Sequence, residues 1–277
     1  MATKPRGLIL DLFGGYLRFV GPEIRAAVLV NLLGAFGVEQ ATARMTLSRL
    51  RQQNWLATRR SGRETYYRLS EPMLEILDEG RERIFGPYAS DWDGSWTQVV
   101  FQTPDADRAV REGLKKRLAW LGFGPLSTST WLSPRPASDH VRDLPADFPA
   151  ASVDLMRART DDLLLDRDLA RRCWDLDQLN ADYRVFIDTH RHLLEEAPRM
   201  DGASALVART ELVSTFRHFP FRDPQLPSQL RPEDWCGAQA HDLFRDVHRA
   251  LAPVATAYVS AVIGETVPLM DLAAENM

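Results

Sequence analysis

One glycine between two amphipathic runs most constrains how this chain can fold. Gly37 ends a run that begins near Pro22, a residue whose fixed φ suits the first turn of a helix. Apolar residues recur there at helical spacing, and glycine accepts the left-handed conformation that closes a helix. A second periodic run starts at residue 40, so the pattern predicts two helices joined by a tight turn. The apolar positions of the first run are Ile24, Val28, Leu32, Ala35 and Phe36.

The second helix, predicted over residues 40–53, has two different faces. Ala43, Leu47 and Leu50 share one face and are expected to be buried. The opposite side carries short polar groups, arginines and a methionine, which can contact bases and phosphates in a major groove. A solvated amphipathic helix would carry the same face, so both interpretations stay open for the helix alone. The candidate DNA-binding residues are Thr42, Arg44, Met45, Ser48, Arg49 and Gln52.

A β-hairpin is predicted directly after this helix. Residues 55–59 and 64–69 favour strands, and residues 60–63 form the turn between them. The hairpin carries Arg59, Arg60 and Arg63 and has no acid before Glu64. Cations on such a hairpin can contact the DNA backbone or the minor groove. Helix, turn, helix and hairpin together predict a winged helix-turn-helix that binds double-stranded DNA.

The distribution of charge supports this interpretation. The whole chain has a net charge of −4, which by itself argues against nucleic acid. Residues 1–70, however, contain eleven basic and four acidic side chains, so this segment carries +7 and the remainder −11. A basic head on an acidic body is expected when only the head contacts phosphate.

The rest of the chain falls into two further segments. Residues 96–101 form a strand pattern, a helix is expected over residues 106–121, and a second strand over 128–132. This order suggests a small α/β sandwich. From about residue 175 the chain is mostly helical, with breaks at Pro198, at residues 220–227 and at Pro232. We therefore expect an α+β protein with domains over residues 1–88, 89–174 and 175–277.

Nothing in the sequence predicts export or a membrane span. No stretch approaches the roughly 18 apolar residues that a span needs, and Asp11 interrupts the apolar run at residues 8–10. Cys173 and Cys236 form neither a metal-type pair nor a disulfide framework. These features predict a cytoplasmic protein with reduced thiols and no membrane contact.

Three groups of short motifs extend across nearly the whole chain. The first covers residues 37–39, 44–50, 55–56, 62–63 and 66–69; the second covers 92–96, 117–124 and 131–134; the third covers 221–227 and 232–235. In this order they resemble the phenylacetic-acid catabolism repressor (PaaX) family. Asn54 replaces the glycine that is usual before the Trp-Leu pair, but asparagine tolerates a left-handed turn.

The resemblance implies a winged-helix head, a ferredoxin-like middle domain similar to the small CRISPR nuclease Cas2, and a helical C-terminal domain. It also implies a dimeric repressor of aromatic-acid catabolic genes that an acyl-CoA such as phenylacetyl-CoA releases from DNA. One recognition helix covers too few base pairs for specificity in a genome, so we expect a homodimer and a palindromic operator.

Cationic side chains are the candidates for binding an anionic effector. Residues 216–222 mix aromatic and cationic groups, and an arginine pair lies at residues 171–172, near the end of the middle segment. Alternatively, residues 216–222 are a proline-broken junction in which Arg222 pairs with Asp223. A free aromatic acid is the alternative effector, because the acidic body repels coenzyme A. The candidates are Arg217, His218, Arg222, Arg171 and Arg172, and the run at residues 115–117 can also hold phosphates.

A metal-dependent nuclease or hydrolase built on the middle domain is the alternative function. Such an enzyme needs carboxylates at strand ends, and residues 97–101 contain none. Asp105 and Asp107 suit the cap of the following helix instead. We therefore expect a regulator without catalytic residues.

Histidines near the C-terminus form weak metal motifs. His190 and His192 would point about 200° apart on a helix, so only His192 and Glu195 could share an ion. His241 and His248 are expected to line a helix packing face. We expect neither a metal site nor a cofactor.

Overall fold

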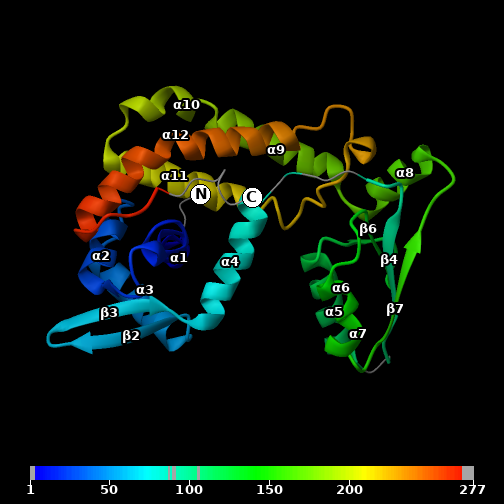
Figure 1. Cartoon of the computed structure of the whole chain (residues 1–277), viewed down its shortest axis with the longest axis horizontal. Coiled ribbons are helices and arrows are strands. Elements are labelled where there is room, and N and C mark those ends of the chain that lie inside the picture. Colours follow the sequence, from blue (N-terminus) through cyan, green and yellow to red (C-terminus); the bar gives the residue numbers. More distant parts are fainter. Residues whose placement is uncertain (1–3, 87, 89–91, 105–106, 270–277) are drawn as a thin grey trace. The chain divides into compact units, whose positions relative to one another are not determined.

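The computed structural model describes residues 4–86, 88, 92–104 and 107–269 and separates into two compact units (Figure 1). The first unit comprises Met1–Gly86, Val185–Arg217 and Gln239–Met277, and the second comprises Pro87–Arg184 and His218–Ala238. The packing thus groups the N-terminal segment with C-terminal helices. The division into three domains remains a prediction from the sequence.

The N-terminal part of the first unit is helical with one small sheet. Its elements are α1 (Pro5–Gly15), η1 (Leu17–Phe19), β1 (Ile24–Arg25), α2 (Ala26–Gly34), α3 (Gln40–Gln52), β2 (Leu56–Ser61), β3 (Glu64–Leu69) and α4 (Glu71–Phe85). The three strands are antiparallel in the order β1-β3-β2. Helix α1 was not predicted from the sequence, although its Leu8, Ile9, Leu12 and Phe13 are buried at helical spacing.

Two turn positions agree with the sequence analysis and one helix start does not. Gly37 has φ 72° and Asn54 has φ 58°, so both adopt the left-handed conformation that was expected. The predicted start of the first helix at Pro22 is wrong, because α2 begins at Ala26. Ile24 and the residue after it are extended instead and pair with β3.

The C-terminal part of the first unit surrounds an aromatic core. It contains α10 (Leu193–Glu196), η2 (Ala197–Arg199), α11 (Gly202–Phe216) and most of α12 (Gly237–Ile263), while α9 (Leu176–His190) contributes to both units. The rings of Phe216 and Phe244 stack at 4.0 Å, and Phe85 lies 5.4 Å from Phe244. His241 and His248 are buried against these rings, which confirms the expected packing face. In the described residues, no helix is long and apolar enough to cross a membrane.

The second unit is built on a four-stranded antiparallel sheet. Its elements are β4 (Trp96–Gln102), α5 (Arg108–Trp120), β5 (Gly124–Pro125), β6 (Thr130–Ser133), α6 (Asp139–Arg142), α7 (Leu144–Asp147), β7 (Ser152–Ala158), α8 (Leu163–Cys173) and η3 (Ser228–Leu230). The strand order β5-β6-β4-β7 is that of a ferredoxin-like β-α-β-β-α-β unit, in which α6 and α7 occupy the place of the second helix. Strands β4 and β6 and helix α5 were predicted from the sequence pattern, whereas β5 and β7 were not.

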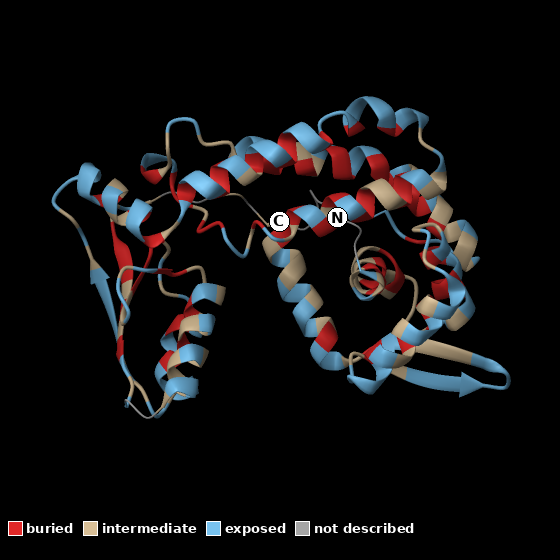
Figure 2. Cartoon of the chain, turned by 180° about the vertical axis from the view of Figure 1, so that it is seen from behind, coloured by how far each residue is buried: buried red, intermediate tan, exposed pale blue. Residues whose placement is uncertain are grey.

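Both faces of this sheet are covered by buried residues. Val99, Phe101 and Leu118 belong to the core on the α5 side. On the other face, Trp96 packs with Ala170 of α8 and donates a hydrogen bond of 2.7 Å to the buried carboxylate of Asp166. In Figure 2 the helices have buried residues on one side and exposed residues on the other, whereas strand β7 is mostly exposed.

A buried carboxylate fixes the proline-rich segment of the second unit. Asp223 accepts hydrogen bonds from the hydroxyls of Tyr183 (2.7 Å) and Tyr88 (3.1 Å) and from the backbone N–H of Gln225 (2.6 Å). Burial raises the pKa of Asp223. Arg222 pairs with Asp182 instead, so the alternative in which Arg222 pairs with Asp223 is wrong.

Candidate nucleic-acid interface

Helix α3 presents its predicted polar face to solvent. Ala43, Leu47 and Leu50 are buried and anchor the helix from the other side, as the periodicity predicted. Met45 is 49% exposed, so its side chain is accessible on this face. The remaining candidates on this face are Arg44, Arg49 and Gln52, which are exposed, and Thr42 and Ser48, which are partly buried.

The hairpin after α3 extends away from the helices of its unit (Figure 1). Ser61 pairs with Glu64 across the turn, where Gly62 has φ 59°. Arg60 and Arg63 are exposed, and neither forms an ion pair with any residue that the structure describes. Both side chains are therefore available for a polyanion.

Arg59 differs from these two arginines. Its Nε lies 2.5 Å from Oε2 of Glu23, and its guanidinium lies over the ring of Tyr66 at 4.7 Å. The sequence shows no acid between Arg59 and Glu64, but β1 brings a carboxylate from 36 residues away. Partial neutralisation makes Arg59 a weaker candidate than Arg60 or Arg63.

Helix α1 connects α3 to the C-terminal helices within the first unit. It packs against both α3 and α11. Nη1 of Arg217 lies 2.5 Å from Oδ1 of Asp11, whose side chain is only 7% exposed. Burial raises the pKa of Asp11 to about 6, although Arg217 and a hydrogen bond from Ser214 oppose this shift. Arg217, a predicted effector ligand, is thus engaged in an ion pair.

The other effector candidates lie in the second unit. Arg222 pairs at 2.6 Å with Asp182. His218 belongs to the same unit, whereas Arg217 belongs to the first. The assignment of these residues to one effector site remains a prediction.

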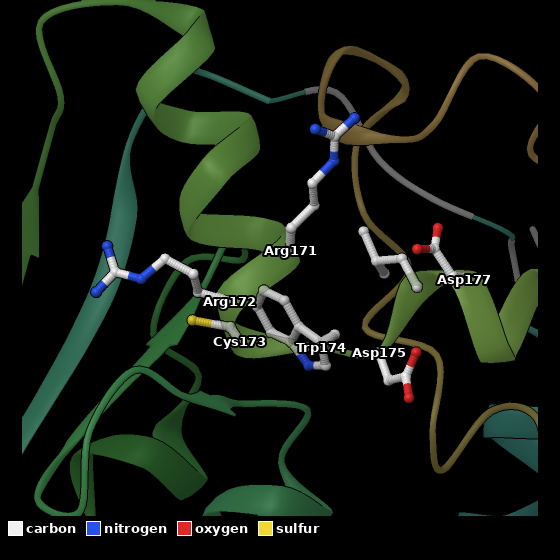
Figure 3. A pocket seen from close by; sticks show the side chains of 7 residues that line it. Arg171, Arg172, Cys173, Trp174, Asp175 and Asp177 are labelled. Carbon is white, nitrogen blue, oxygen red and sulfur yellow. The ribbon is translucent and has the colours of Figure 1, made fainter.

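Arg171 and Arg172 line a cavity of about 340 Å³ at the end of α8 (Figure 3). Their side chains point in different directions, and the carboxylates of Asp175 and Asp177 lie on the opposite side of Trp174. Arg172 also lies 3.5 Å from a carboxylate oxygen of Asp168. The cavity therefore has mixed charge rather than a concentrated positive charge.

A second cavity, of about 490 Å³, has two cations and no carboxylate among its lining residues. Nε of Arg111 donates a hydrogen bond of 2.9 Å to Thr103, and Lys115 lies 3.5 Å from Glu112. Of the cationic run at residues 115–117, only Lys115 lines this cavity. The spacing of two cations four residues apart on α5 is the signal that would have identified it. The lining residues are Phe101, Gln102, Thr103, Arg111, Lys115, Thr128 and Ser129.

The described part of the chain contains no group of three or more metal-ligating side chains. His192 lies 4.0 Å from Glu196 rather than near Glu195, and Nδ1 of the buried His190 lies 2.8 Å from the carbonyl of Phe186. The side chain of Asp107 makes no cap hydrogen bond, and Asp105 lies outside the described residues.

One unit of the chain holds a ferredoxin-like sheet and the other holds an exposed basic helix and hairpin, and comparison with known proteins assigns the chain to a family of regulators. Residues 4–73 match the PaaX-like protein family, residues 89–170 the PaaX protein central Cas2-like domain, and residues 174–261 the PaaX-like protein C-terminal domain. The chain belongs to the PaaX family.

Two similar proteins extend this result. The transcriptional repressor PaaX of Escherichia coli (strain K12) is 31% identical over 94% of this chain and 84% of its own length. An uncharacterized protein from Mycobacterium tuberculosis has a similar fold, with a TM-score of 0.59 and 24% identity over 95% of this chain and 99% of its own. The first relationship supports a role as a transcriptional repressor.

Proposed function

We propose that this protein is a DNA-binding transcriptional repressor in which α3 enters the major groove and the β2–β3 hairpin acts as a wing. The observation that carries the proposal is a set of exposed arginines on two consecutive elements. Arg44 and Arg49 can make paired hydrogen bonds to guanine, whereas Arg60 and Arg63 can contact phosphates. The repressor function of the Escherichia coli relative supports this assignment.

The proposed repressor acts as a homodimer on a palindromic operator. A single α3 helix would cover only a few base pairs, whereas two copies related by a two-fold axis double the length of DNA that is recognised. The net charge of +7 on residues 1–70 disfavours pairing of one basic head with another, so the interface is placed in the middle or C-terminal segment.

A small effector is proposed to release the repressor from DNA. An aryl-acyl-CoA such as phenylacetyl-CoA is the first candidate, and a free aromatic acid is the second. A ligand shifts the conformational balance only by its different affinity for the two states. An anion that competes with Asp11 for Arg217 would free one side of α1, which also contacts α3. This ion pair is therefore a candidate point of coupling.

An electrophoretic mobility assay on DNA upstream of the gene tests the repressor. Retarded but intact DNA is expected, both with Mg²⁺ and with a chelator, whereas metal-dependent cleavage would overturn the proposal.

Calorimetry with phenylacetyl-CoA, phenylacetate and plain coenzyme A then tests the effector. Binding and DNA release with the free acid alone would refute the thioester and leave the repressor intact.

A further inference from the structure

Arg209, on α11, is a buried arginine to which the described part of the chain supplies no carboxylate partner. The residue is only 4% exposed. Its Nε donates one hydrogen bond, of 3.3 Å, to the backbone carbonyl of His248, and its guanidinium carbon lies 5.0 Å from the centre of the Tyr16 ring. Arg18, by contrast, has a side chain that is 9% exposed and pairs with Asp78 at 2.6 Å. A buried guanidinium without a counter-charge is strongly unfavourable, which indicates a partner that is not part of the chain.

Two polar atoms beside Arg209 are also buried without a hydrogen-bond partner in the described chain. They are the hydroxyl of Tyr16, at the end of α1, and Nδ1 of His248, on α12. Buried polar atoms in native proteins are nearly always satisfied by the protein, by water or by a bound ion. A phenolic hydroxyl can donate a hydrogen bond, and a neutral imidazole can donate from Nδ1. Donors from three segments of the chain therefore lie around one buried positive charge.

The charges that act on His248 are all positive. Burial, with Arg209, Arg81 and Arg249, lowers the pKa of His248 well below its ordinary value, and among the described residues no carboxylate opposes this shift. His248 is therefore neutral near pH 7 and contributes a donor without a second charge. Arg249 is already paired with Asp246 at 3.2 Å. An electropositive interior of this kind attracts an anion.

We propose that Arg209, Tyr16 and His248 form a buried binding site for a small monovalent anion within the first unit. A guanidinium and two neutral donors suit an ion that accepts several hydrogen bonds. Because all three residues are buried, the ion must be small, which favours a halide or the carboxylate of a short acid over a phosphate ester. Water would satisfy the donors but would leave the charge of Arg209 uncompensated.

The bound anion would connect distant segments of the first unit. Tyr16 lies between α1 and η1, whereas Arg209 and His248 belong to the C-terminal helices. Helix α1 packs against both α3 and α11, so the ion would stabilise the arrangement on which α3 rests. The inference goes beyond the proposed repressor, and its test uses no DNA, so either can fail without the other.

Thermal unfolding of the full-length protein tests the site. Replacing gluconate with chloride or acetate at constant ionic strength should raise the Tm of the wild type by at least about 2 °C for one of the two anions, because an ion that binds only the folded state stabilises it. Arg209→Gln should abolish this rise. Tyr16→Phe keeps the buried charge and should reduce the rise, so it decides the question even if Arg209→Gln does not fold. A rise that is unchanged in either variant would overturn the inference.

Arg135→Gln is the matched control in the other unit. Nη2 of Arg135 is satisfied by the carbonyl of Pro224 (3.1 Å) and by Oε1 of Gln225 (2.9 Å), so this arginine needs no bound ion. The variant should lower the Tm but keep the full response to the anion. Loss of the response in Arg135→Gln would show that it follows stability in general and would overturn the inference.

The choice of anion identifies the ligand class. A Tm rise with chloride and bromide but not with acetate assigns a halide, and the reverse assigns a carboxylate. For a halide, the chloride NMR signal should broaden with the wild type and at least about tenfold less with Arg209→Gln, because the charged donor is lost. If neither chloride nor acetate raises the Tm of the wild type, water alone satisfies these atoms and the inference is wrong.

Discussion

Arg217, just after α11, lies 2.5 Å from the carboxylate of Asp11 in α1, although 206 residues separate them in sequence. Within the described chain, the second oxygen of Asp11, Oδ2, is buried without a hydrogen-bond partner. The ion pair therefore joins the N-terminal helix to the C-terminal helices at an energetic cost, since one carboxylate oxygen is uncompensated.

Asp11 should make stability depend on pH in a specific direction. Burial raises its pKa from the ordinary 3.8 to about 6 in the folded state, so the folded state binds the proton more tightly. The stabilisation from protonation is full below about pH 4 and is lost as the pH rises through 6. Asp11→Asn should remove this dependence. We compare the unfolding free energy of Asp11→Asn with that of the wild type at each pH. This difference should favour the variant more at pH 7.5 than at pH 4.5, by about 2 kcal/mol.

Urea unfolding of both proteins at the two pH values measures this difference. Asp182→Asn is the control, because Asp182 also pairs with an arginine but is 32% exposed. It should change the unfolding free energy by less than about 1 kcal/mol at either pH. An Asp11→Asn effect that is equal at both pH values would contradict the role of the buried carboxylate.

The turn between α3 and β2 should depend on a residue that tolerates positive φ. Asn54 has φ 58° and is exposed, so its conformation rather than its packing matters. Asn54→Ala should lower the unfolding free energy by about 1 kcal/mol, because a β-carbon without a local hydrogen bond is disfavoured there. Asn54→Gly should be neutral or slightly stabilising. Thermal unfolding of the three proteins checks the order, and equal losses for alanine and glycine would count against it.

The periodicity predicted local structure well because it depends on neighbouring residues. The buried face of α3, the hairpin, β4, α5 and β6 all follow from spacing within short windows. Helix α2 was predicted too early because Ile24 pairs with Tyr67, and a pairing over this separation leaves no local signal. Strand β7 was missed for a related reason, since its exposed Leu155 and Met156 hide the alternation of a half-buried strand.

The candidate site was predictable where side chains face solvent and less so where distant elements meet. Arg49 and Arg60 were found from helix and hairpin geometry alone. The contact of Arg59 with Glu23 and that of Arg217 with Asp11 required the tertiary structure. Local sequence therefore identified the cations but not which of them are already paired.

The phenols around Asp223 should stabilise the second unit. Tyr183→Phe removes a donor 2.7 Å from this buried carboxylate and should cost about 1–3 kcal/mol. Tyr67→Phe is the control, since the described chain offers its hydroxyl no hydrogen-bond partner, and it should cost less than about 0.5 kcal/mol. Chemical denaturation followed by tryptophan fluorescence measures both. Equal losses would show that Asp223 does not need the Tyr183 hydroxyl.

The arginines of α3 and of the hairpin should affect DNA binding in different ways. Arg49→Ala should weaken binding to the operator by about 1–3 kcal/mol and change non-specific binding less, because a base contact carries sequence information. Arg60→Ala and Arg63→Ala should weaken binding to all sequences. Each should also reduce the slope of log affinity against log salt by about one, because each removes one phosphate contact.

Arg59→Ala is the matched control on the same hairpin. Its guanidinium is already paired with Glu23, so its loss removes less positive charge from the DNA-facing surface and should change the salt slope by clearly less than one. Fluorescence anisotropy with operator and random duplexes, over a series of salt concentrations, separates the specific from the electrostatic effect. If Arg49, Arg60 and Arg63 can all be replaced together without loss of affinity, α3 and the hairpin are not the DNA-binding surface. If Arg59→Ala matches Arg60→Ala, the pairing with Glu23 does not limit its contact with phosphate.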